Sequence, residues 1–101
     1  MLLKRYEEAL RSFDRAVENN ADDGVTHSNR GLCLKELGRY DEALISFDRV
    51  LEIEPESAEM HRNRGACLKD QGRYGEALAA YDRALKIKPE MLMAIVQEKS
   101  A

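Results

Sequence analysis

Apolar residues in this chain recur with the spacing of one face of an α-helix. Starting from Tyr40, apolar positions follow at offsets of 3, 4, 7, 10 and 11 residues. Those offsets trace one stripe on a helix of about 3.6 residues per turn. They predict an amphipathic helix over residues 40–54. Equivalent stripes that start at Tyr6 and Tyr74 predict helices over 6–20 and 74–88.

Two further segments, 24–37 and 58–71, align with each other and alternate with these helices. They share a histidine, an Asn-Arg-Gly triplet and a Cys-Leu-Lys triplet at equivalent positions. We call these two segments the first helices and the amphipathic ones the second helices. Gly38 follows one first helix and Gly72 follows the other, where a left-handed residue is needed to end a helix. Each second helix that precedes a proline must stop before it.

The whole pattern has a fixed period. The stretch Gly38–Leu44 returns in large part 34 residues later, at Gly72–Leu78. A period of this size is typical of stacked helical repeats, and short loops make neighbouring helices antiparallel. We therefore predict a single domain. Its parts are the second helix of a partial repeat at 1–23, repeats at 24–57 and 58–91, and a capping or partial helix at 92–101.

Small residues are expected where the two helices of a repeat meet. Gly31 and Ala43 would let the backbones approach closely, and the large Phe47 would then fill the space toward the next repeat. Asp23 and Ser57 are expected to cap the first helices, because their side chains can accept a hydrogen bond from a free backbone N–H.

Both full repeats place the same kinds of residue at the same unit positions. These residues are Gly31, Gly38, Tyr40, Ala43, Phe47 and Pro55 in one repeat, and Gly65, Gly72, Tyr74, Ala77, Tyr81 and Pro89 in the other. This set resembles the tetratricopeptide repeat family, whose unit also has 34 residues. The resemblance implies an all-α fold of antiparallel helix–turn–helix repeats stacked as a short right-handed superhelix.

The chain departs from the family pattern at a few positions. His27 stands where tryptophan is common, and Arg30 stands where leucine is usual. We expect the arginine stem to lie along apolar surface with its guanidinium in water. In the closing segment, Lys99 stands where the repeat would place a glycine.

Composition and charge exclude several classes of protein. The formal net charge is −3 and acids and bases are interleaved, so no nucleic acid partner is expected. No apolar run approaches the roughly 20 residues that span a bilayer, so no membrane contact is expected. Lys4 and Arg5 interrupt the apolar run that a signal peptide would need. Two cysteines are too few for a framework of disulfides. We predict a cytoplasmic protein.

Side chains that could carry chemistry do not form a reactive set. His27 and Cys33 are six residues apart, on different faces of a helix, so they predict no metal site. Cys33 and Cys67 would lie on separate helices, beyond disulfide reach. The pair Asp14-Arg15, which recurs in the other second helices, is interpreted as a solvated face. We predict a protein that is not an enzyme and needs no cofactor.

The resemblance implies a peptide-binding groove on the concave side, lined by the first helices. Its residues would be Val25, Ser28, Asn29, Leu32, Lys35 and Glu36 of one repeat, and Glu59, Arg62, Asn63, Ala66, Lys69 and Asp70 of the other. The amide of Asn29 could both donate to and accept from a peptide backbone, and asparagine recurs at Asn63. Alternatively, both asparagines are duplicated surface residues. A clamp for chaperone tails would need other residues at Ser28 and Leu32.

The predicted function is therefore a non-catalytic protein–protein interaction scaffold that binds a partner peptide or helix in this groove. One alternative is a fragment of a larger enzyme or secretion or assembly factor that contains such repeats. Another is a purely self-assembling structural module. The helix in 1–23 lacks the first helix with which it would pair, so a homo-oligomer through the terminal helices is a further possibility.

Overall fold

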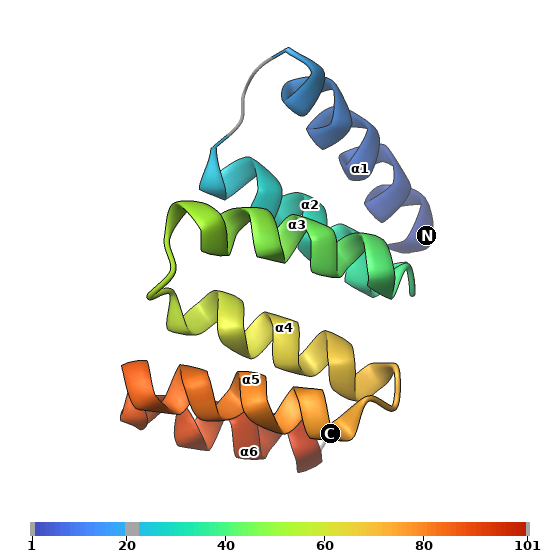
Figure 1. The fold of residues 1–101 in the computed structure, drawn as a ribbon. Coiled ribbons are helices and arrows are strands. Elements are labelled where there is room, and N and C mark those ends of the chain that lie inside the picture. Colours follow the sequence, from blue (N-terminus) through green and yellow to red (C-terminus); the bar gives the residue numbers. More distant parts are fainter. Residues whose placement is uncertain (1, 20–22, 101) are drawn as a thin grey trace. The chain divides into compact units, whose positions relative to one another are not determined.

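The computed structural model describes residues 2–19 and 23–100, which are helical apart from short turns (Figure 1). The helices are α1 (Leu2–Glu18), α2 (Gly24–Glu36), α3 (Tyr40–Ile53), α4 (Ala58–Asp70), α5 (Tyr74–Ile87) and α6 (Leu92–Ser100), with a 3₁₀ turn at Pro89–Met91 before α6. The predicted all-α fold is confirmed. The chain divides into two compact units, 1–55 and 56–101. The single domain and the superhelical stacking stay predictions.

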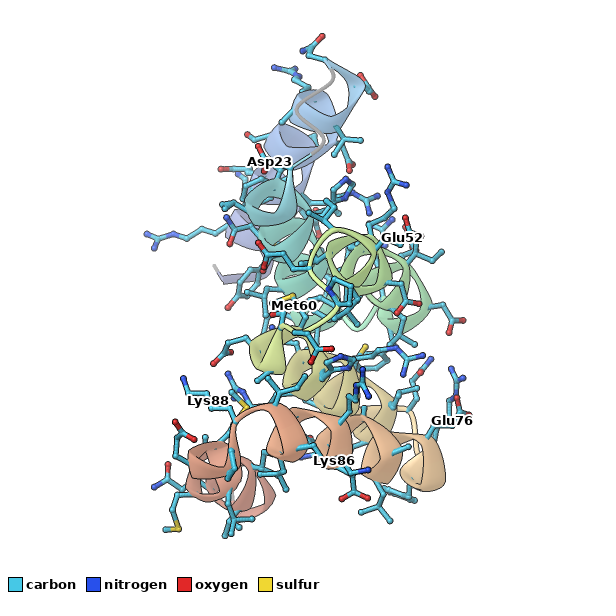
Figure 2. All side chains as sticks on the ribbon, turned by 60° about the vertical axis from the view of Figure 1, so that its left-hand side comes forward. Asp23, Glu52, Met60, Glu76, Lys86 and Lys88 are labelled. Carbon is cyan, nitrogen blue, oxygen red and sulfur yellow. The ribbon has the colours of Figure 1, made fainter. Side chains whose placement is uncertain are left out.

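Each first helix begins at the predicted cap. The Asp23 carboxylate accepts a hydrogen bond from the Thr26 N–H at 2.7 Å, and Asp23 lies at the start of α2 (Figure 2). The Ser57 hydroxyl accepts one from the Met60 N–H at 3.3 Å. Each side chain therefore satisfies one of the amides that the first turn of a helix leaves free.

Each first helix also ends as predicted, at a left-handed glycine. Gly38 has a φ of 76° and Gly72 a φ of 79°, which costs glycine little because it has no Cβ. The Arg39 N–H donates to the Leu34 carbonyl at 2.8 Å and the Gly38 N–H to the Lys35 carbonyl at 3.0 Å. This pair of bonds is a Schellman motif. The resulting tight turn lets α2 and α3 run antiparallel, as α4 and α5 do after the matching turn (Figure 1).

An aromatic ring packed on a glycine joins the two helices of each repeat. A Cβ built on Gly31 would lie 2.6 Å from Phe47 Cε1, and one on Gly65 would lie 3.0 Å from Tyr81 Cε1. Phe47 is fully buried. That Phe47 also packs toward the next repeat stays a prediction. The ring fills the space that the missing side chain leaves within its own repeat.

An arginine–glutamate pair marks the start of each complete second helix. Arg39 donates to both carboxylate oxygens of Glu42, at 2.9 and 2.7 Å, and Arg73 does the same with Glu76 at 3.1 and 2.7 Å. Glu76 lies in the first turn of α5 (Figure 2). The hydrogen bond from Arg39, helped by the arginine charge, lowers the pKa of Glu42 below its ordinary value.

The ring-on-glycine contact can be tested with two Gly→Ala substitutions. Gly31→Ala would push a methyl group into the buried Phe47 ring, so we expect a loss of about 1–3 kcal/mol in the free energy of unfolding. Gly75→Ala is the control, because a Cβ there meets nothing within 4 Å. The free energy of unfolding of the control should rise by up to about 1 kcal/mol, because alanine has a higher helix propensity than glycine. Urea unfolding followed by circular dichroism measures both, and equal stability of the two variants would contradict the contact.

The Arg39–Glu42 pair predicts that the stability of the fold depends on pH. The pKa of Glu42 is lowered in the folded chain, so the pair contributes stability above the ordinary pKa of a glutamate. That contribution is lost as the pH falls through the lowered pKa. In Arg39→Gln we expect the pKa of Glu42 to rise back, as read from the NMR titration of its carboxyl carbon. Arg73→Gln should leave Glu42 unchanged and raise the pKa of Glu76 instead. An unaltered Glu42 titration in Arg39→Gln would refute this assignment.

Candidate functional site

Arg30 ties three helices of the first unit together. Its Nε donates to Asp14 Oδ1 on α1 at 2.6 Å, and its Nη1 donates to Ser46 Oγ on α3 at 2.8 Å. Ser46 is buried, so its hydroxyl needs such a partner. The prediction of a solvated guanidinium at Arg30 is wrong, whereas the Asp14 side chain is 41% exposed, as predicted, although it also binds Arg30. The two groups hold α1 against α2.

A hollow of about 490 Å³ lies between α1 and α2. Its lining is Arg5, Tyr6, Ala9 and Phe13 from α1, and Asn29, Leu32, Cys33 and Glu36 from α2. Most of this lining is apolar, while one cation, one anion, one amide and the Tyr6 hydroxyl supply the polar groups. Such a combination of apolar surface with a few polar groups is typical of ligand and peptide sites.

The thiol in this hollow is a packing group and not a nucleophile. Cys33 is buried and free of any disulfide, as is Cys67. Burial, with a smaller contribution from the Glu36 carboxylate, raises the pKa of the Cys33 thiol. A thiol with a raised pKa stays protonated at neutral pH and is inert. It therefore behaves as a small apolar residue.

The predicted groove residues of α2 form one stripe along that helix. Val25 is 72% exposed and Leu32 is 38% exposed. Ser28, Asn29 and Lys35 are half-buried, and Glu36 is exposed. The structure brings Asn29, Leu32 and Glu36 together in the hollow. Their contact with a partner stays a prediction.

The equivalent stripe on α4 differs in shape and charge. Ala66, which matches Leu32 in the repeat, is buried and offers little surface. Arg62 Nη2 donates to Glu59 Oε2 at 2.7 Å, so these two charges compensate each other. Asn63 and Lys69 are half-buried, and Asp70 is exposed. This stripe is therefore more polar than the one on α2.

Sequence reasoning missed the α1 side of the hollow. Arg5, Tyr6, Ala9 and Phe13 are the equivalents, one period earlier, of residues of α3 and its turn. The period located α1 in the sequence. Which of its residues share a hollow with α2 depends on how the two helices pack.

Two further hollows have less apolar linings. One of about 350 Å³ is lined by Leu10, Leu37 and four charged residues of both signs, Glu7, Arg11, Asp14 and Arg39. One of about 310 Å³ in the second unit combines three glutamates and a lysine with apolar and hydroxyl groups. Within residues 2–19 and 23–100, no group of three or more His, Cys, Asp or Glu residues is arranged to hold a metal ion. None of the helices in these ranges has the length and apolar character of a membrane span.

This architecture is that of a helical repeat domain, and comparison with known families gives the same result. Residues 22–90 match the Tetratricopeptide repeat family, which is more than half of the chain. The chain therefore belongs to the tetratricopeptide repeat family, whose domains typically bind proteins and are usually non-catalytic. A comparison with curated proteins finds no match.

Several solved structures are similar. YrrB, described as a TPR protein with an unusual peptide-binding site, has 33% identity and a TM-score of 0.86, with 96% of this chain and 50% of YrrB covered. A mutant of MamA has 28% identity and a TM-score of 0.80 over 86% of this chain and 64% of the MamA chain. The Arabidopsis OM64 TPR domain has 25% identity and a TM-score of 0.84 over 96% and 80%. The chain thus spans half of YrrB and less than two thirds of MamA.

The Arg30 contacts predict the effect of removing one acid. Asp14→Ala would leave the half-buried guanidinium without its carboxylate, so we expect the free energy of unfolding to fall by about 1–3 kcal/mol. Asp82→Ala is the matched control, because Asp82 occupies the equivalent repeat position and is exposed. The control should change stability by less than about 0.5 kcal/mol. Thermal unfolding of the two variants measures the difference, and equal losses would show that Asp14 has no special role.

Proposed function

We propose that this chain is a non-catalytic protein–protein interaction module in which the first helix of each unit, α2 or α4, offers its exposed stripe to a partner peptide or helix. The observation that carries the proposal is the hollow between α1 and α2. It joins apolar surface from Ala9, Phe13 and Leu32 to the amide of Asn29. Apolar contact supplies the driving force for association, and a placed amide fixes the position of a partner backbone.

The polar groups on the two stripes support the same proposal. Asn29 and Asn63 are half-buried on their helices, at the same unit position. Asparagine is a weak helix former, so its recurrence inside two helices favours a use for the amide. Arg62 is held by Glu59, which fixes the position of its guanidinium donors.

The proposal extends to a cytoplasmic setting and to the alternative of a larger protein. Two free and buried thiols fit a reducing compartment. The chain spans only half of YrrB, which favours a role as the binding segment of a longer scaffold or assembly factor. In either case the contact surface would be the same.

Binding to selected peptides tests the function directly. Peptides would be selected against the wild-type chain from a display library, and their dissociation constants measured by calorimetry. The variant Asn29→Ala/Arg62→Ala/Asn63→Ala removes two amides and one guanidinium. We expect it to bind the selected peptides at least tenfold more weakly, because each lost hydrogen bond is worth about 0.5–1.5 kcal/mol and more where charge is involved.

The control variant is Asp82→Ala/Lys86→Ala, which changes two exposed residues of α5 (Lys86 is labelled in Figure 2). It should bind as the wild type does. Equal affinity of the wild type and the triple variant for every selected peptide would remove the first helices from the binding surface.

A further inference from the structure

The cap of α2 and the residue after it form an Asp-Gly dipeptide, Asp23-Gly24. Nowhere else in the sequence does an aspartate or an asparagine directly precede a glycine. In such a dipeptide the amide nitrogen of the glycine can attack the carboxyl carbon of the preceding side chain. Glycine favours this attack because it has no Cβ to shield that nitrogen or to restrict rotation of the backbone.

The start of α2 provides the conditions for this attack. Gly24 is the first residue of the helix, so its N–H has no acceptor inside the helix. Asp23 is exposed, so water reaches its carboxyl group. The Thr26 N–H donates to Asp23 Oδ1 at 2.7 Å, and negative charge develops on this oxygen when the nitrogen attacks. A backbone N–H at a helix N-terminus stabilises such charge, as the donors of an oxyanion hole do.

We infer that Asp23-Gly24 is a site of spontaneous backbone isomerisation, which removes the cap of α2 as the protein ages. A bond forms between the Gly24 nitrogen and the Asp23 carboxyl carbon, and the carboxyl hydroxyl leaves with the amide proton as water. Water then opens the succinimide ring at the backbone carbonyl carbon of Asp23, and the bond from that carbon to the nitrogen breaks. The chain now runs through the former side chain, which is isoaspartate. One water is released and one is consumed, and no group is oxidised or reduced.

The isomerised residue cannot cap α2 in the same way. Its free carboxylate is attached directly to Cα, and an additional methylene group lies in the backbone. The first turn of α2, which carries Val25, therefore loses the hydrogen bond that satisfies the Thr26 N–H. The cap of the second unit is not open to this reaction, because the equivalent residues there are Ser57 and Ala58.

Ageing of the full chain tests the inference. The chain is kept in warm neutral buffer for several weeks and digested, and mass spectrometry with electron-transfer fragmentation distinguishes isoaspartate from aspartate in its peptides. We expect isoaspartate at residue 23 to accumulate severalfold faster than at Asp48 or Asp82, which are exposed and precede arginine. Gly24→Ala is the matched variant and should slow the reaction severalfold. It keeps the cap, and its Cβ would lie at an ordinary 3.8 Å from Val50 Cγ1, so we expect it to fold.

A second measurement follows the cap itself. The isomerised fraction is isolated by chromatography, and its thermal midpoint should fall to that of Asp23→Ala. Its Thr26 amide proton should exchange with solvent faster than in fresh protein. The Met60 amide, which the Ser57 hydroxyl caps, should exchange as before.

Several results would overturn the inference. One is equal accumulation of isoaspartate in the wild type and in Gly24→Ala, and another is accumulation at residue 23 no faster than at Asp48 and Asp82. Isoaspartate that forms at residue 23 only after unfolding in urea would show that the fold protects the dipeptide. An isomerised fraction with the thermal midpoint and the Thr26 exchange rate of fresh protein would refute the loss of the cap.

Discussion

The helix pairs of this chain depend on an aromatic ring packed against a stretch of backbone that has no side chain. Gly31 and Phe47 make this contact in one repeat, and Gly65 and Tyr81 make it in the other. Protein interiors are packed as densely as organic crystals, so one added methyl group has no room beside a buried ring. The contact therefore fixes both the distance between the paired helices and their register.

The other features of each repeat follow from holding two helices this close. A tight turn is required between them, and Gly38 and Gly72 supply it with positive φ angles. The arginine of that turn then pairs with the glutamate three residues later, at the start of the second helix. Such exposed pairs contribute little stability by themselves, since water and salt screen them. The pair recurs at the same unit position in both repeats. This suggests that it orients the turn, while the ring and the glycine set the distance between the two helices.

Much of this fold could be predicted from the sequence, because its signals are local. The caps at Asp23 and Ser57 and the turns at Gly38 and Gly72 each depend on residues a few positions away. The contacts of Arg30 could not be predicted in this way. Its partners Asp14 and Ser46 each lie 16 residues away, on different helices. Which polar groups meet at that range depends on how the helices pack.

The candidate site shows the same division between local and long-range information. Asn29 and Leu32 were identified from their unit positions, which depend only on the period. Leu32 and Ala66 share a unit position, yet one is exposed and the other is buried. The α1 wall of the hollow was missed, because the residues of α1 and α2 that share a hollow are set by how the two helices pack. Periodicity finds the positions of residues, while their exposure depends on neighbours in space.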